Sequence, residues 1–212
     1  MIEEIYAQTV LTKRTFSHSQ MEGTPVDPFE WARIVHAGQE ITPSEEQQRK
    51  PYLEYVKRNI DAVLTKKKLC VIGVEKNQHV LNVKVPGHDI EFVGTTDLLI
   101  LRDTVKKDPS SLEFLPGVEM LIEVKKKVEH RNNFLALSEL VALDLRANGP
   151  VMALLTDLNK YWIFFWVAEK KSNSVLIHRA FIDNPGEGFE VIKTLLEQSS
   201  ADIDAGIEIP YS

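Results

Sequence analysis

Two stretches decide how this chain is expected to fold: VGTTDLLIL (residues 93–101) and, after a polar segment, EMLIEVKKK (residues 119–127). Both are apolar and typical of β-strands, yet each carries an acid in its apolar run, Asp97 in the first and Glu123 in the second. A lysine, Lys125, follows two residues after the second acid. The two stretches therefore predict neighbouring strands of a sheet that present charged side chains.

The alternation of side chains along the second stretch predicts which of them share a face. Glu119, Glu123 and Lys125 fall on one face, and Met120, Ile122 and Val124 fall on the other. Burying such charges costs several kcal/mol unless each has a partner. Two acids and a lysine therefore indicate a bound metal or a polar substrate. The residues also leave open an ion pair between Glu123 and Lys125 on a solvated sheet face.

Composition predicts one globular domain with a substantial core, because 43% of the 212 residues are hydrophobic and 26% are charged. The single Cys70 excludes an intramolecular disulfide and favours a reducing compartment. The longest apolar run, residues 161–168, is too short to span a bilayer, so we expect no membrane partner. We expect this run to be sheet core rather than a surface that stacks bases, because both of its faces are apolar.

The net charge of −6 belongs entirely to residues 183–212, and residues 1–182 are electrically balanced. Local clusters of cations matter more for phosphate binding than the sum does. Lys126, Lys127 and Arg131 form such a cluster beside the second stretch and are our candidates for contacting nucleic acid. The chain as a whole does not have the composition of a strongly basic nucleic-acid binder.

Capping and periodicity predict the remaining elements. Asp27-Pro28-Phe29-Glu30 predicts a helix that ends near Gly38, and Thr42-Pro43-Ser44-Glu45 predicts a second helix that Pro51 kinks or breaks. We further expect a helix through residue 66, a hairpin of residues 69–75 and 80–85, and a largely buried helix over 131–147. Strands are expected over residues 89–101, 151–156, 161–168 and 174–182, and a closing helix over 188–198.

The order of these features resembles a known family. A strand with Gly94 and Asp97, a strand with Glu123-x-Lys125 and a helix directly after it resemble the PD-(D/E)XK nuclease superfamily, which has a restriction-endonuclease-like core. The segments ALSELVALDL (residues 136–145) and PVMALLTDLNKYWIFFW (residues 150–166) also look like the nuclease-like C-terminal domains of Crinkler-type effector proteins. Together the resemblances cover residues 53–181.

This resemblance implies an α/β fold of the α+β kind, in which helices flank a central mixed β-sheet and an extra helical segment precedes the core. We expect an N-terminal helical extension over residues 1–50, the PD-(D/E)XK nuclease-like domain over 51–199 and an acidic tail over 200–212.

The resemblance also implies a metal-dependent site. Asp97 would be the bridging ligand of Mg²⁺ or Mn²⁺, Glu123 the second ligand and the Val124 carbonyl a third, since Mg²⁺ needs only one or two carboxylates. Lys125 would orient the attacking water and stabilise charge on the phosphate.

Further polar residues are expected near this site. By resemblance, the helix after the E-x-K strand carries a polar residue that faces the site, for which we select Glu139 or Ser138. Glu119 is a candidate for a second metal, although a surface acid at a strand end is the simpler interpretation. Some members of the family also place an acid of the first helix near the metal, which Glu54 or Asp61 would supply here; a solvent-facing carboxylate is the alternative for both.

The resemblance implies that the chain hydrolyses phosphodiester bonds in nucleic acid, and we expect DNA rather than RNA as the substrate. It would act inside a cell, in the cytoplasm or the nucleus, as an effector domain. For an effector, the nucleus would be that of the host. The alternative is a catalytically inactive nuclease-like fold that binds nucleic acid or protein, since a fold does not fix a function. An inhibitor or structural partner that uses the aromatic strand is a third reading, which no specific residue supports.

Overall fold

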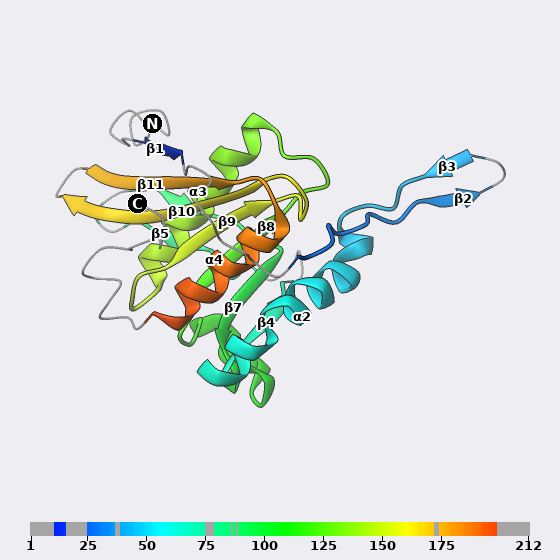
Figure 1. Ribbon diagram of the computed structural model, residues 1–212. Coiled ribbons are helices and arrows are strands. Elements are labelled where there is room, and N and C mark those ends of the chain that lie inside the picture. Colours follow the sequence, from blue (N-terminus) through cyan, green and yellow to red (C-terminus); the bar gives the residue numbers. More distant parts are fainter. Residues whose placement is uncertain are drawn as a thin grey trace.

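The computed structural model describes residues 11–15, 25–36, 39–74, 79–85, 87, 89–171 and 174–198. Its main feature is a mixed seven-stranded sheet with strand order β1-β11-β10-β9-β8-β7-β4 (Figure 1). The strands of this sheet are β1 (Leu11–Thr15), β4 (Leu69–Gly73), β7 (Leu98–Arg102), β8 (Met120–Val124), β9 (Met152–Thr156), β10 (Trp162–Lys171) and β11 (Ser174–Ile182). The long helices are α2 (Arg49–Lys67), α3 (His130–Arg146) and α4 (Pro185–Glu197).

Shorter elements complete the described chain. They are the hairpin β2 (Ile34–His36) and β3 (Gln39–Ile41), the pair β5 (Val83–Lys84) and β6 (Glu91–Phe92), and the 3-10 helices η1 (Glu46–Gln48), η2 (Asp103–Lys106) and η3 (Pro109–Phe114). The mixed α+β architecture expected from the sequence is confirmed. No helix within the described ranges combines the length and apolar character that crossing a bilayer requires.

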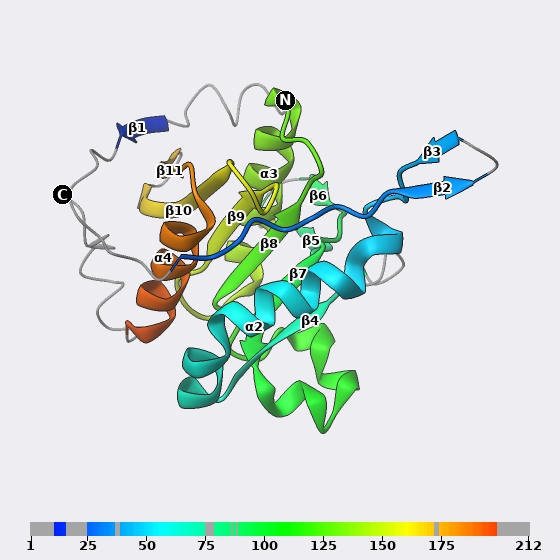
Figure 2. The same cartoon turned by 45° about the vertical axis from the view of Figure 1, so that its right-hand side comes forward.

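Helices cover both faces of the sheet, with α2 and α4 on one side and α3 on the other (Figure 2). Met120, Ile122 and Val124 of β8 pack in the core beneath α2 and α4, whereas Leu121 packs in the core beneath α3. The alternation predicted along β8 is therefore confirmed. Residues 162–166 of β10 divide their side chains between the two cores in the same way and are buried, as expected of sheet core, whereas residues 168–170 of this strand are exposed.

The strand order places the two motif segments side by side. Strand β7 runs antiparallel to β8, with Leu98 opposite Ile122. Strand β9 runs parallel to β8, and α3 makes the crossover between them. Since β7 starts where β8 ends, Asp97 lies beside the end of β8 that carries Glu123. A pairing between residues far apart in sequence thus creates the site.

The helix predicted from Asp27 is wrong. Residues 25–33 have no regular secondary structure and lead into the β2–β3 hairpin, which projects from the body (Figures 1 and 2). Long-range contacts explain the difference: the Phe29 amide donates to the Leu158 carbonyl, and Trp31 Nε1 donates to the Asp157 carbonyl. These bonds, and the packing of both rings on the α2 side of the core, override the local capping pattern.

The second predicted helix starts later and is not broken. After η1, helix α2 begins at Arg49 and runs to Lys67, so Pro51 lies in its first turn. The first amides of a helix have no partner within it, so a proline there removes no hydrogen bond. Among the described residues before α2, η1 is the only helix, and β1, β2 and β3 are the other regular elements. Of the expected N-terminal helical extension, residues 1–10, 16–24, 37 and 38 lie outside the described residues, as do residue 199 and the expected tail.

The predicted hairpin of residues 69–85 is also wrong. Strand β4 pairs with β7, and β5 pairs with β6 instead. Strand β4 begins with three buried residues and needs a partner within the sheet, which a local hairpin does not supply. Helix α3 lies where it was predicted, within one residue at each end. It is less buried than expected, because Phe134, Leu135 and Leu145 are exposed.

Candidate functional site

The site lies where the start of β7 meets the end of β8, and Asp97 is fixed firmly there. Its Oδ2 accepts a hydrogen bond of 2.9 Å from the Val124 amide, and its Oδ1 accepts one of 3.3 Å from the Tyr52 hydroxyl of α2. Burial, followed by the nearby Asp97 carboxylate, raises the pKa of Tyr52, so this hydroxyl keeps its proton. Two separate donors therefore hold the first predicted acid in one orientation.

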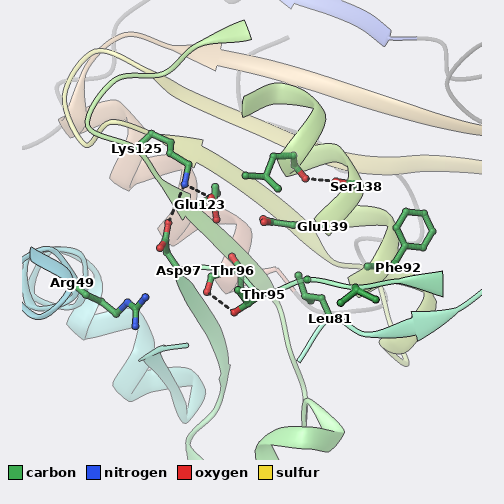
Figure 3. A pocket seen from close by; sticks show the side chains of 14 residues that line it. Arg49, Leu81, Phe92, Thr95, Thr96, Asp97, Glu123, Lys125, Ser138 and Glu139 are labelled. Atoms are coloured by element: carbon green, nitrogen blue, oxygen red, sulfur yellow. Dashed lines mark hydrogen bonds and ion pairs between the residues drawn. The ribbon is translucent and has the colours of Figure 1, made fainter. Parts of the chain in front are cut away.

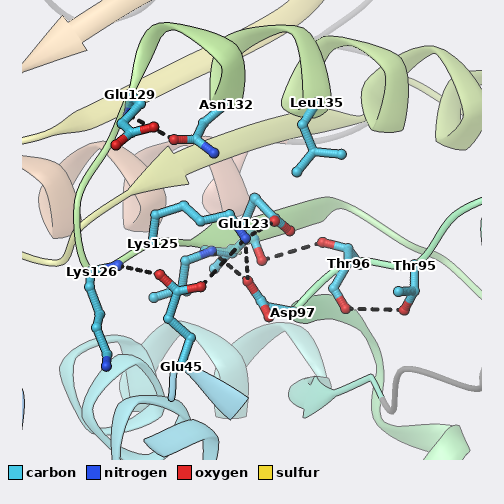
Figure 4. Close-up of polar contacts among 12 residues, drawn as sticks. Glu45, Thr95, Thr96, Asp97, Glu123, Lys125, Lys126, Glu129, Asn132 and Leu135 are labelled. Atoms are coloured by element: carbon cyan, nitrogen blue, oxygen red, sulfur yellow. Dashed lines mark hydrogen bonds and ion pairs between the residues drawn. The ribbon is translucent and has the colours of Figure 1, made fainter. Parts of the chain in front are cut away.

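The ammonium of Lys125 joins three carboxylates (Figure 4). Its Nζ forms an ion pair with Glu123 Oε1 and lies 3.9 Å from Asp97 Oδ2 and 3.8 Å from Glu45 Oε2. The ion pair between Glu123 and Lys125 that the residues left open therefore exists. It is not a solvated surface pair, because the Glu123 side chain is only 5% exposed.

The electrostatics show an excess of buried acid. Burial, followed by the Asp97 carboxylate, raises the pKa of Glu123 to about 7, against the opposing effect of Lys125. Burial also raises the pKa of Asp97, opposed by Lys125 and by the Val124 amide. For Lys125, burial alone lowers the pKa, but the carboxylates, Glu123 first, raise it above its usual value. Lys125 is therefore a cation, which suits charge stabilisation rather than proton abstraction.

Helix α3 contributes a third buried acid to the same pocket (Figure 3). Glu139 is 4% exposed, and its Oε2 atom is buried without a hydrogen-bond partner among the described residues. Burial, and then the Glu123 and Asp97 carboxylates, raise its pKa well above the usual value. Ser138 also lines the pocket, but its hydroxyl donates to the Leu135 carbonyl of its own helix. Of the two residues selected from α3, Glu139 is the one buried without a partner.

These acids border a pocket of about 340 Å³. Its charged end contains Asp97, Glu123, Lys125 and Arg49 of α2. Leu81 and Phe92 form its apolar end, on the far side of Glu139 from Asp97 (Figure 3), and Val93, Leu135 and Ala142 add apolar surface to the lining. Thr95 and Thr96 contribute to the lining as well, and Thr96 is fixed by a 3.3 Å hydrogen bond from its hydroxyl to the Ile122 carbonyl.

Other predicted acids lie elsewhere. Glu119 is at the opposite end of β8, half-buried near Arg102, and does not line the pocket. Glu54 is exposed, and its Oε1 atom lies 3.6 Å from Nζ of Lys57 on the same helix. Asp61 is exposed as well. The acid near the start of α2 is instead Glu45, which precedes η1. The sequence signal for Glu45 was a capping pattern, and nothing in it indicated contact with β8.

The predicted nucleic-acid contacts differ among themselves. The Lys126 amide donates to Glu45 Oε1 at 2.7 Å and its ammonium to the Pro43 carbonyl, so Lys126 ties the base of the β2–β3 hairpin to the end of β8. Lys127 is exposed, and Arg131 is exposed with its Nε 3.0 Å from Glu129 Oε2. Lys127 and Arg131 are therefore accessible to a ligand, whereas Lys126 is engaged in a structural contact.

The donor set suits a hard divalent cation. Within the parts of the chain that the structure describes, no group of three or more His, Cys, Asp or Glu side chains is placed to hold a metal ion. Mg²⁺ nonetheless keeps several waters and requires only one or two carboxylates, which Asp97 and Glu123 offer here. Val124, predicted to give a third ligand through its carbonyl, donates its amide to Asp97 and is not among the residues that line the pocket. Three carboxyls whose pKa values are raised by burial, those of Asp97, Glu123 and Glu139, fit the additional positive charge.

Comparisons with known proteins identify relatives of this chain. No protein-family model and no solved structure matches it. The chain is 51% identical to Crinkler effector protein 63 of Phytophthora sojae (strain P6497), over 93% of this chain and 50% of that protein. It is 45% identical to Crinkler effector protein 2 of Phytophthora infestans, over 98% and 49%, and 41% identical to Crinkler effector protein 4 of Phytophthora capsici, over 99% and 54%. The chain spans about half the length of these relatives, and its homologues are Crinkler effector proteins.

Proposed function

We propose that this chain is a metal-dependent phosphodiesterase that hydrolyses nucleic acid, DNA in preference to RNA, with a PD-(D/E)XK-type site. The observation that carries the proposal is the meeting of Asp97, Glu123 and Lys125 in one buried cluster at the charged end of a pocket. An E-x-K strand next to β7, which Asp97 directly precedes, with a helix directly after the E-x-K strand, supports the same assignment. Structural stability alone does not require this arrangement, because an apolar pair would cost less to bury.

Each residue has a definite role in this proposal. Asp97, Glu123 and the Val124 carbonyl would hold Mg²⁺ or Mn²⁺, which when bound supplies an activated water and neutralises charge on the phosphate. Tyr52 and the Val124 amide keep the Asp97 carboxylate oriented for that task. Lys125 binds the phosphoryl oxygens as a cation, and Arg49 adds positive charge to the same pocket.

The homologues extend the proposal to the biological role. Each is named a Crinkler effector protein, and the similarity covers nearly the whole of this chain. We therefore infer an effector role for the chain, carried out inside a host cell in the cytoplasm or the nucleus, where nucleic acid is the partner.

A second function is a binding module without catalysis. The observation that favours it is the ion pair of Glu123 with Lys125, which partners both charges without any metal. In that case the pocket would bind nucleic acid or protein, and the acids would serve only the architecture of the site.

Cleavage assays separate these functions. Purified protein is incubated with plasmid, linear duplex, single-stranded DNA and RNA in Mg²⁺, in Mn²⁺ and in EDTA. We expect cleavage that EDTA abolishes, that Asp97→Ala removes and that Asp61→Ala retains, because Asp61 is an exposed acid outside the pocket. Binding without cleavage in any metal would instead establish the binding module.

A further inference from the structure

The apolar end of the pocket has no part in phosphate chemistry. Leu81, Phe92, Val93, Leu135 and Ala142 line the same pocket as the charged cluster, and Val93 is 65% exposed. Hydrolysis of a phosphodiester needs charge and water, and these side chains supply neither. Apolar surface that is exposed in a pocket marks a place where an apolar part of a ligand binds.

Glu139 places an unsatisfied acceptor in the same pocket. Figure 3 shows this side chain between Glu123 on one side and Leu81 and Phe92 on the other. A buried polar atom without a partner costs about 1–3 kcal/mol, so the free Oε2 atom needs a reason. A ligand that donates an N–H to this oxygen would supply one. A carboxyl group has an oxygen that accepts whether or not the group is protonated.

We propose that the apolar end of the pocket holds one unpaired nucleobase of the nucleic-acid substrate, whose exocyclic amino group donates a hydrogen bond to Glu139. This inference rests on the proposed function, because it assigns the substrate of the same site. A base is a flat apolar body with polar edges, and its phosphate would lie toward Lys125 and Arg49. Apolar side chains against the face of an unpaired base and hydrogen bonds to its pairing edge are the usual means of recognition.

Two specificities follow from this arrangement. Adenine, cytosine and guanine carry an exocyclic amino group, whereas thymine and uracil present oxygens there, which have no hydrogen to donate to the Glu139 oxygen. In a duplex the bases are stacked and their amino groups are paired, so the pocket favours single strands and unpaired positions. The preferred substrate is therefore an unpaired nucleotide with an amino-bearing base.

Binding measured in EDTA tests the subsite without catalysis. The probes are fluorescent oligo-dC and oligo-dT of equal length, because the two pyrimidines differ little in size, together with a mixed-sequence duplex. Anisotropy should show oligo-dC bound about tenfold or more tightly than oligo-dT, and the duplex more weakly than oligo-dC. Oligo-rC and oligo-rU should show the same order.

Variants of α3 assign the preference to one residue. Glu139→Gln, which has nearly the same shape, carries an amide that can donate to thymine, so the ratio of oligo-dC to oligo-dT affinity should fall toward one. Glu139→Ala should remove the preference. Asp144→Asn is the matched control, because Asp144 is a poorly exposed acid on the same helix that pairs with Lys170 at 2.8 Å outside the pocket. Circular dichroism verifies that each variant is folded.

The outcomes distinguish this inference from the proposed function. Equal affinity for oligo-dC and oligo-dT in a protein that cleaves DNA overturns the base subsite and leaves the nuclease function standing. A preference for oligo-dC that depends on Glu139, in a protein that cleaves nothing, supports the base subsite and overturns the nuclease function. A preference that Glu139→Gln and Glu139→Ala leave intact, or no binding of any oligonucleotide, overturns the subsite.

Discussion

Glu119 and Glu123 are the same residue type on the same face of one short stretch of chain, yet only one of them belongs to a site. Glu119 is half-buried at the start of the stretch, where burial raises its pKa and Arg102 and Lys67 oppose this effect. Glu123 is buried at the other end with Lys125 and Asp97. The difference comes from the neighbouring elements. Alternation determines which face a side chain occupies, and the partner strands and helices determine what it meets there.

The largest effect should come from exchanging the two acids for amides. Glu123→Gln removes a ligand oxygen of the proposed cation, so metal-dependent cleavage should fall about 10²- to 10³-fold. Glu119→Gln should leave the rate within about twofold, because Glu119 does not line the pocket. Initial rates on labelled DNA with saturating Mg²⁺ measure both. Equal losses for the two variants would mean that position along β8 does not matter and that the site is misplaced.

The second effect compares two lysines. Lys125→Met should slow cleavage about 10²-fold and leave Mg²⁺ affinity unchanged or stronger, because the ammonium contacts both carboxylates and would stabilise phosphate charge. Lys127→Met, at an exposed residue, should weaken binding modestly and reduce its salt dependence. Isothermal titration with Mg²⁺ and single-turnover rates separate the two behaviours. A Lys125 variant that cleaves normally would reduce this residue to a structural counter-ion.

The third effect concerns the stability of the metal-free protein. The pKa of Glu123 is raised to about 7 from its usual 4.5, so the folded state holds this proton more firmly than the unfolded state does. Its contribution to stability is therefore complete below pH 4.5 and is lost as pH rises toward 7, while Lys125 stays charged throughout. Glu123→Gln should then raise the free energy of unfolding by about 1–3 kcal/mol at pH 8 and by little at pH 4.5.

Urea unfolding in EDTA at the two pH values measures this difference. Adding Mg²⁺ at pH 8 should stabilise the wild type more than the Glu123→Gln variant, because binding to the folded state adds to stability. Destabilisation of the variant at both pH values would show that Glu123 serves the fold through its ion pair. The residue would then resemble an ordinary buried partner of Lys125.

The smallest effect should come from the acidic C-terminal segment. Residues 183–212 carry the whole net charge of −6, and acids at 202, 204 and 208 lie outside the described residues. Deleting residues 199–212 should leave nucleic-acid affinity unchanged or slightly higher, because the deletion removes acids that repel phosphate and salt screens this repulsion. Anisotropy at low and at moderate salt measures it. A clear loss of binding in a folded variant would assign the segment a direct contact.

The sequence predicted the parts of the fold that depend on local pattern. The alternation along β8, the position of α3 and the burial of β10 on both faces follow from periodicity, and the structure confirms them. The pairing of β4 with β7 was missed, because the burial of β4 does not specify its partner. The Asp27 helix failed because aromatic contacts with residues 157–158 outweigh a helix cap.

The sequence likewise predicted some residues of the candidate site and missed others. Asp97, Glu123 and Lys125 could be selected because charges in apolar strands are unusual, and their spacing resembles a family pattern. Glu45 and Tyr52 could not be selected, because their roles depend on how α2 and its preceding segment pack against β8. Glu139 was one of two candidates on α3, and only the burial of its carboxyl distinguishes it from Ser138.

Hydrogen bonds between the base of the β2–β3 hairpin and the residues that follow β8 connect the projecting hairpin to the site. Glu45 and Pro43 at the base of the hairpin both hold Lys126, which is covalently next to Lys125. The hairpin is therefore connected to Lys125 through one peptide unit, and this connection does not run through the hydrophobic core. Glu45 also lies 3.8 Å from the Lys125 ammonium through its Oε2, so the base of the hairpin joins the site lysine by a direct contact as well as along the chain.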